Sequence, residues 1–231
     1  MQHYLLYGAA GAQEPTAPQA GGRQAGRQGV PKVEIGGQFT HLGLTEFPDV
    51  PEVFRRFRPS PGVGGRVTYN LTDHLSVEAE ANFFPFKVNE EGFLLTEARI
   101  LAGGRRFQAQ FGFKAGKRFR SFGLFVKGRP GVVSFGRSSI LVGTRPVPFT
   151  NPPIIEGIFE DKRATFFSAD VGGVVELYQS RRWLLRFDAG DTIIRYRARH
   201  VPRFFTNPAL HTIPAETKHN LQFSTGVGFC F

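Results

Sequence analysis

Sulfur-containing residues are nearly absent from this sequence, which has one cysteine and one methionine among 231 residues. A lone cysteine excludes an intramolecular disulfide framework and any metal site built from several cysteines. Long hydrophobic runs are also missing, since no window approaches eighteen uninterrupted apolar residues. That absence excludes a transmembrane helix, but it leaves open a membrane crossed by strands, whose signal per segment is much weaker.

Glycine and phenylalanine are abundant instead, with 28 and 25 copies. Many β-formers bounded by glycine and other turn residues favour strands over helices. The length allows one all-β domain or two small ones. The formal charge of +10 indicates an anionic neighbour, which could be nucleic acid, lipid phosphate or lipopolysaccharide.

The first residues contain a segment that looks like a processing signal. Residues 10–12 (Ala-Gly-Ala) resemble an A-x-A cleavage site before Gln13, although a basic n-region is missing and the apolar part is short. We interpret residues 1–12 as a signal-peptide remnant, with a disordered tail as the alternative. Residues 13–31 are rich in Gly, Pro and Gln and predict a flexible leader, which leaves 32–231 as the folded domain.

Apolar and polar residues alternate in eight segments of that domain. Successive side chains of a strand point to opposite faces, so each segment predicts a strand with one apolar and one polar face. The segments are 32–40, 62–70, 74–84, 106–116, 122–129, 165–177, 183–191 and 219–231. Pro130 predicts a bulge or a strand end. Four apolar residues fall on the polar faces: Phe125, Phe166, Val174 and Leu184.

Short and long connections alternate strictly between these segments. The short ones are hairpin turns at about 71–73, 116–121 and 178–182. The long ones span about 43–60, 85–104, 136–163 and 198–218. This alternation predicts an eight-stranded, antiparallel up-and-down barrel with turns at one rim and four long loops at the other.

The polar faces carry a balanced set of charges, six acids and six bases, although the whole chain has a formal charge of +10. Water-facing strands need no such balance, whereas a narrow interior does, because an unpaired buried charge is strongly destabilising. We therefore predict a lumen charge network of Glu34, Arg66, Glu78, Glu80, Arg106, Lys114, Lys127, Arg129, Asp170, Glu176, Arg186 and Asp188. The apolar faces then meet lipid. A soluble β-sandwich with aromatics scattered by chance is the alternative.

Aromatic residues on the apolar faces gather at two levels of the predicted barrel. Smaller aliphatic residues lie between the two levels, and aromatic girdles flanking an apolar band are typical of a transmembrane barrel. The turn-side girdle contains Tyr69, Phe122, Trp183 and Phe231, and the loop-side girdle contains Phe39, Phe83, Phe107 and Phe167.

Two stretches carry a resemblance to a known family. "GVGGRVTYNLTDHLSVEAEANFF" resembles the second hairpin, and "LQFSTGVGFCF" the terminal strand, of the small eight-stranded outer-membrane β-barrel proteins of the OmpA/OmpX kind. The resemblance implies a bacterial outer-membrane location and short periplasmic turns. It also implies that the barrel-assembly machinery recognises Phe223, Val227, Phe229 and Phe231. The long loops depart from that family, so it implies nothing about them.

We expect twelve inward charges to plug the lumen, since eight strands leave an interior just filled by side chains. The expected function is non-enzymatic and structural or surface-interacting, through the external loops. The expected partners are the lipid bilayer and lipopolysaccharide, with arginines of "FRRFR" (54–58) and "RYRARHVPR" (195–203) facing lipid phosphates. Those arginines could instead be solvated; no nucleic-acid motif accompanies them. We expect a monomer.

Two other functions stay open. An outer-membrane enzyme acting on lipid A or phospholipid, as hydrolase or acyltransferase, would draw on His41, His200 or His211 with Ser138 or Ser139. A narrow channel for small solutes would use inward-facing Phe125 and Phe166. No cofactor or metal is expected, because the histidines lack ligand spacing.

Overall fold

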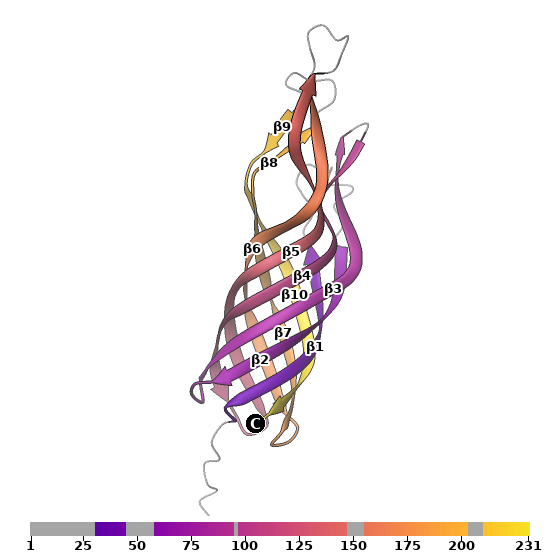
Figure 1. Ribbon diagram of the computed structural model, residues 1–231. Coiled ribbons are helices and arrows are strands. Elements are labelled where there is room, and N and C mark those ends of the chain that lie inside the picture. Colours follow the sequence, from indigo (N-terminus) through magenta and orange to yellow (C-terminus); the bar gives the residue numbers. More distant parts are fainter. Residues whose placement is uncertain (1–30, 45–57, 95–96, 147–154, 203–209) are drawn as a thin grey trace, which may run out of the picture.

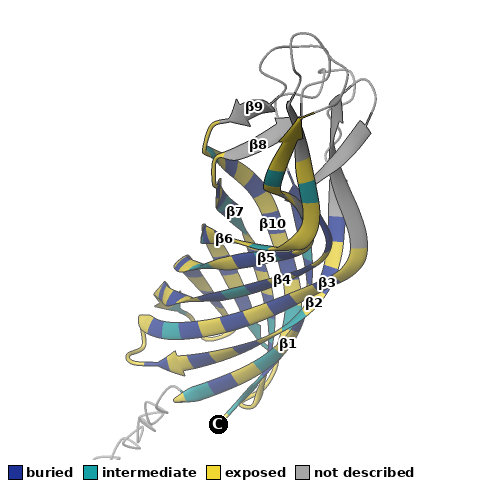
Figure 2. Cartoon of the chain, turned by 45° about the horizontal axis from the view of Figure 1, so that its top comes forward, coloured by how far each residue is buried: buried dark blue, intermediate teal, exposed yellow. Residues whose placement is uncertain are grey.

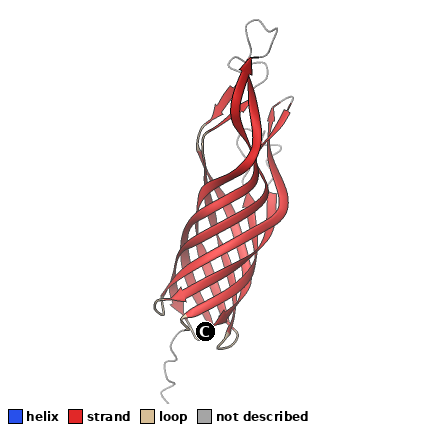
Figure 3. Ribbon diagram, viewed as in Figure 1, coloured by secondary structure: helices blue, strands red, loops and turns tan. Residues whose placement is uncertain are grey.

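The computed structural model describes residues 31–44, 58–94, 97–146, 155–202 and 210–231. The described chain consists of strands and short connections (Figure 3). None of its segments is a helix that is long and apolar enough to span a membrane. The predicted signal remnant and all of the predicted leader except Pro31 lie outside the described residues.

Eight strands close into an antiparallel barrel in the ring order β1-β10-β7-β6-β5-β4-β3-β2, which confirms the predicted architecture (Figure 1). A further pair, β8 and β9, forms a separate two-stranded sheet. The barrel strands are β1 (Val33–Leu44), β2 (Arg58–Asn70), β3 (Leu75–Leu94), β4 (Glu97–Arg118), β5 (Phe122–Pro146), β6 (Ile155–Tyr178), β7 (Trp183–Tyr196) and β10 (Glu216–Cys230). The small sheet consists of β8 (Arg199–Pro202) and β9 (Leu210–Ile213).

The first and last strands close the ring. β1 and β10 pair from Glu34↔Cys230 to Leu42↔Gln222. At the turn-side rim, Lys32 N donates to Phe231 O at 3.1 Å and Phe231 N to Val33 O at 2.9 Å. The closed ring therefore leaves no strand edge along the wall.

Tight turns occupy one rim, where the C-terminus also lies (Figure 1). Between β2 and β3, Leu71 N and Thr72 N both donate to Leu75 O at 3.0 Å. The Thr72 hydroxyl in turn accepts the Leu75 N–H at 3.0 Å. These hydrogen bonds satisfy the backbone locally, so three short connections suffice at this rim.

At the opposite rim, two of the predicted long loops are largely strand. β3 and β4 pair up to Leu94↔Glu97, and β5 and β6 up to Pro146↔Ile155. The expected loops 85–104 and 136–163 are therefore mostly hairpins that rise beyond the barrel (Figure 1). The register shifts on the way, between Phe84 and Val88 in β3 and between Phe135 and Ser138 in β5. Bulges break a period-two pattern, which is why alternation alone ended these strands too early.

Two smaller differences from the predictions also follow from strand pairing. The link 198–218 contains β8 and β9. Pro130 neither ends nor bulges β5, because its ladder to β6 continues through Pro130↔Ala169 without a shift. Toward β4 the ladder skips from Gln110↔Gly131 to Phe113↔Gly128. Proline has no backbone N–H, and the gap lies on the side where that N–H would have donated to β4. The strand therefore tolerates one missing ladder hydrogen bond without forming a bulge.

Candidate functional site

The two faces of the barrel wall have opposite character. Buried and exposed residues alternate along the strands (Figure 2). All twelve charged residues of the predicted lumen network are buried, none more than 5% exposed. Large apolar side chains stand outside, for example Phe39 at 69% and Val126 at 67% exposure. Exposure of so much apolar surface to water would be unfavourable. A wall of this polarity is therefore stable when lipid surrounds it.

Arg186 of β7 lies at the centre of the ionic layer. Its guanidinium donates to both Glu78 oxygens, at 2.5 and 2.9 Å, and to both Asp188 oxygens at 2.8 Å. Glu78 also accepts the Thr68 hydroxyl at 3.1 Å. β7 and β3 are four places apart in the ring of eight, so the Arg186–Glu78 pair joins opposite walls.

A second group of ions lies next to it. Arg129 donates to Asp170 and to Glu80, in each case at 2.5 Å. Lys127 lies between Asp170 and Asp188, at 2.9 and 3.2 Å. Both bases come from β5, where alternate inward positions place them one above the other. Asp170 and Asp188 each pair with two or more cations, and Glu80 pairs with Arg129, which offsets the desolvation of these carboxylates.

Nearest the turn-side rim, Lys114 pairs with Glu176 and lies 3.4 Å from Glu78. Arg118 joins this end of the layer, donating to Glu34 at 3.0 Å and Asn70 at 2.7 Å. Arg118 falls within the predicted turn 116–121, so the predicted lumen network does not include it. Its parity is that of Lys114 on the same strand, so alternation continued past residue 116 was the available signal.

Above the ions, uncharged polar side chains form a hydrogen-bonded chain across the lumen. Gln38 donates to Asn82 at 2.8 Å, Asn82 to Gln108 at 3.0 Å, and Gln108 to Gln222 at 2.9 Å. Gln222 also accepts the Thr192 hydroxyl at 2.6 Å. Gln108 and Gln222 come from β4 and β10, which are again opposite strands of the ring. The lumen is therefore bridged at a second level.

A buried apolar cluster fills the lumen at the loop-side end, and the sequence analysis anticipated only one member of it, Phe166. Phe166 packs 4.8 Å from Tyr196 and 5.8 Å from Phe135 between ring centroids. Arg106 lies beside this cluster, where it contacts Ser60 and lies 5.5 Å over the Phe84 ring. The cluster consists of Leu42, Leu44, Phe84, Val133, Phe135, Phe166, Ile194 and Tyr196.

Glycine makes room for the large ions on the inner face. Gly112 of β4 pairs with Glu78 of β3. A Cβ atom at Gly112 would lie 2.7 Å from Arg129 Cα and 3.0 Å from its Cγ. A larger residue there would displace Arg129 from its carboxylates, which explains a glycine on a face otherwise crowded with long side chains.

The residues of both predicted girdles lie on the outer face. All eight are at least 36% exposed, including Phe122 at 36% and Trp183 at 52%. The predicted assembly residues, on β10 and at Phe231 directly after it, share that face, with Phe223, Val227 and Phe231 exposed. Phe229 is partly covered, because its ring lies 5.0 Å from Trp183 and 4.9 Å from Phe231.

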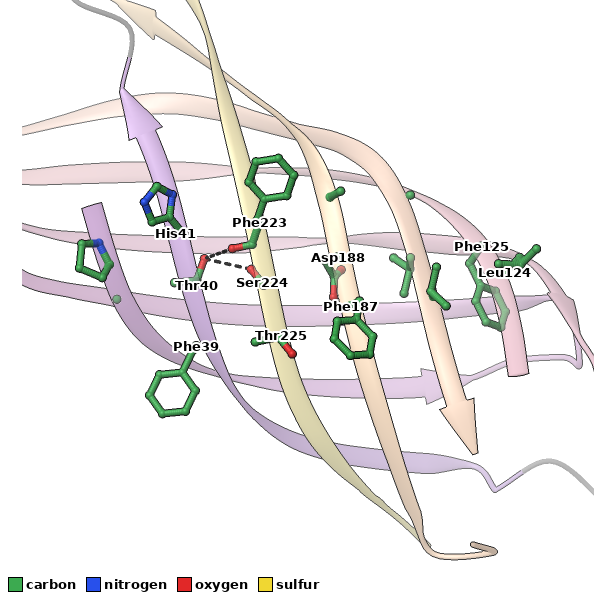
Figure 4. A pocket seen from close by; sticks show the side chains of 16 residues that line it. Phe39, Thr40, His41, Leu124, Phe125, Phe187, Asp188, Phe223, Ser224 and Thr225 are labelled. Atoms are coloured by element: carbon green, nitrogen blue, oxygen red, sulfur yellow. Dashed lines mark hydrogen bonds between the residues drawn. The ribbon is translucent and has the colours of Figure 1, made fainter. Parts of the chain in front are cut away.

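An apolar depression of about 920 Å³ runs along the outer wall from β2 to β5 (Figure 4). Exposed side chains such as Phe39, Phe187 and Phe223 border it, and His41 lies at its upper end. Below His41, Thr40 accepts the Ser224 hydroxyl at 2.9 Å from inside the wall. The depression faces the lipid, so acyl chains can fill it.

Of the candidate enzyme residues, only His41 and Ser138 have described side chains, and the structure does not bring these two together. His41 lies on the outer face, whereas Ser138 is buried inside the barrel. His200 and His211 belong to adjacent pairs of the β8–β9 sheet, but their side chains, like that of Ser139, lie outside the description. Within the described residues, no three His, Cys, Asp or Glu are placed to hold a metal.

A closed ring of eight strands with an apolar outer face and charged side chains in its lumen defines a transmembrane β-barrel of the bacterial outer-membrane type. No protein-family model matches the sequence, and no curated protein matches it significantly. Among solved structures, the chain is similar to the outer membrane protein OprG of Pseudomonas aeruginosa, with 12% identity and a TM-score of 0.47 over 88% of this chain and 97% of OprG. It is similar to outer membrane protein W of E. coli, with 14% identity and a TM-score of 0.46 over 88% and 100% of the two chains.

A more distant likeness is to the outer membrane protease OmpT of Escherichia coli, with 7% identity and a TM-score of 0.29 over 87% and 95% of the two chains. Likenesses with identities and TM-scores this low decide nothing about activity. The class stands on the closed barrel and its polarity.

Proposed function

We propose that this protein is a non-enzymatic outer-membrane barrel with a plugged lumen, and that its role is structural or surface-interacting. The observation that carries the proposal is the bridging of opposite walls, by Arg186–Glu78 in the ionic layer and by Gln108–Gln222 in the amide layer. A lumen crossed by side chains at two levels leaves no wide path for solutes. The variable chemistry then belongs to the segments beyond the membrane.

Planar-bilayer recording of the refolded protein tests the plug. We expect no large, steady conductance from the unaltered protein. A variant with Arg186→Ala and Glu78→Ala removes one bridge and serves as the comparison, and it should conduct more. Large, steady conductance from the unaltered chain would overturn the proposal.

A narrow channel for small apolar solutes is the second candidate, since Phe125 and Phe166 both point inward. Their surroundings argue against a continuous path. Phe166 belongs to the loop-side apolar cluster, whereas Phe125 lies 4.6 Å beneath Lys114 Nζ. An apolar solute would have to cross the ionic layer between them at high desolvation cost. Uptake of a small hydrocarbon by proteoliposomes, above that of empty liposomes, would favour the channel.

The partners that we propose are the lipid bilayer, outer-leaflet lipopolysaccharide and, during biogenesis, the barrel-assembly machinery, with the protein as a monomer. The outward girdle residues support the first. Residues 54–57 of "FRRFR" lie outside the described chain. In "RYRARHVPR", Arg195 and Arg197 are exposed at the loop side of β7, where anionic headgroups would be reached.

A further inference from the structure

Four arginines line one cleft of the barrel wall: the side chain of Arg106 is buried, whereas the exposed Arg105, Arg137 and Arg163 belong to none of the predicted sites. The cleft has a volume of about 770 Å³ and is lined by Arg105 of β4, Arg137 of β5 and Arg163 of β6. Its lower lining includes Phe83 and Phe107, two rings of the loop-side aromatic girdle. A basic site thus lies directly above the apolar band.

Consecutive β-bulges create this cleft. In β4 the register shifts between Gly103↔Arg137 and Arg106↔Phe135, so Gly104 and Arg105 together face Gly136. Gly104 has a φ of +78°, a left-handed conformation that favours glycine. A Cβ there would also lie 3.2 Å from Arg137 N. The bulge therefore requires a glycine, and it turns Arg105 outward beside the next strand.

A matching shift in β5 sets Gly136 and Arg137 against Arg163 of β6. The two bulges, one strand apart, bring the three exposed arginines to a common level on the outer face. Long side chains above an aromatic girdle reach the headgroup region while their stems cover apolar surface.

Among the described residues, acidic partners neutralise only part of the charge of the cleft. Arg137 pairs with Asp161 at 2.6 Å, and both side chains are substantially exposed. Within the described part of the chain, Arg105 and Arg163 have no acidic partner. Two guanidinium groups therefore remain available to an anion, and guanidinium binds phosphate bidentately.

We propose that this cleft binds the phosphorylated headgroup of an outer-leaflet glycolipid of the lipid A type. The position selects the ligand class, because a molecule held there meets arginines above and phenylalanine rings below. A phosphate attached to acyl chains satisfies both, whereas a free phosphate or a phosphopeptide satisfies only the first. The inference deepens the proposed lipopolysaccharide contact and rests on the outer-membrane location.

The test uses the full chain refolded into phosphatidylcholine nanodiscs and titrated with bisphosphorylated lipid A or with the same lipid dephosphorylated. Native mass spectrometry counts the bound lipid. We expect tighter binding of the phosphorylated form, and each of Arg105→Gln and Arg163→Gln should weaken it by roughly tenfold, as loss of a charge-assisted hydrogen bond implies. The matched control is Arg182→Gln, an exposed arginine in the turn at the opposite rim, which should change nothing.

Heat-modifiable migration establishes that each variant is folded, and either of the two arginine variants suffices if the other does not fold. Equal binding of both lipid forms, or unaltered binding by the folded variants, would overturn the cleft. Competition by inorganic phosphate at concentrations near those of the lipid would show a general anion site and would overturn the glycolipid assignment. These binding measurements do not report on conductance. The plugged-lumen proposal is tested separately, by planar-bilayer recording.

Discussion

Arg186 is fully buried, yet all three of its guanidinium nitrogens donate to carboxylate oxygens. A buried charge is tolerated only when such partners replace the lost water. Its neighbours Glu78 and Asp188 have further cationic or hydroxyl partners, so the network has no weak member at its centre. The ionic layer is therefore a structural element of the barrel, and its members should be sensitive to single substitutions.

Glu78→Ala tests this at the residue scale. The change leaves Arg186 and Lys114 without one of their carboxylates, and removal of one partner from a buried pair costs about 3–5 kcal/mol. Denaturant unfolding in detergent micelles measures the loss. Glu160→Ala is the control, because its pair with Lys162 is exposed and such pairs contribute at most about 1 kcal/mol. Equal effects of the two variants would contradict a buried network.

Among the elements, the β5–β6 hairpin has two different parts. Below Phe135↔Ala164 each strand also pairs with a second neighbour in the barrel wall. Above Ser138↔Lys162, within the described chain, the two strands pair only with each other. The upper part is therefore an appendage of the wall, available for surface contacts.

Deletion of residues 142–158 with a short turn in their place should leave the barrel intact. Shortening a connection changes loop-closure free energy by only about 1 kcal/mol or less. Heat-modifiable migration and the denaturation midpoint measure the outcome. Deletion of Val132 alone is the control: it lies in the wall, and a one-residue slip turns every later side chain to the opposite face. Loss of folding in the hairpin variant would show that the upper part stabilises the barrel.

The outward aromatics of β10 make a separate prediction about biogenesis. Phe229→Ser with Phe231→Ser should reduce the amount of assembled protein in the outer-membrane fraction severalfold, while refolding in detergent is affected much less. Phe187→Ser on β7 is the control, since it removes an outward ring from another strand. If both variants lose assembly equally, the β10 residues act as general membrane anchors and not as a recognised signal.

At the scale of the whole molecule, the lumen is nearly charge-balanced, so most of the +10 excess lies elsewhere on the chain. The charge of the protein is distributed over three zones: a neutralised lumen, an uncharged apolar belt on the outer wall and basic rims. Lipid is the solvent that makes this arrangement favourable.

Phe111→Arg tests that polarity. Phe111 is 58% exposed on the outer face of β4, between the two girdles. An arginine at the bilayer midplane should lower the free energy of unfolding by about 2–4 kcal/mol, measured in phospholipid vesicles. Ile140→Arg, on the hairpin beyond the membrane, should have little effect. Equal stability of both variants would mean that Phe111 does not contact lipid.

The sequence by itself determined the number of barrel strands, the ring topology and which face of each barrel strand is buried. The physical reason is the two-residue period of a strand. Because of it, the alternating pattern alone predicts that Glu34 and Arg66 face inward and that Phe39 faces outward. The inward parity of Phe125 and Phe166 was readable in the same way. The face on which a side chain lies depends only on the extended backbone of its own strand. The local sequence pattern therefore predicts it without reference to a partner strand.

Only the tertiary structure decided what lies beside what. Which carboxylate meets Arg186, and that ions, amides and apolar side chains form successive layers, depends on the register between strands. Register and bulges are set by pairings far apart in sequence, so the arginine cleft formed by Arg105, Arg137 and Arg163 has no local signature. The position of a residue in the alternating pattern tells which face of the wall it lies on. Its level along the barrel axis and its neighbours on other strands depend on the shear of the closed ring.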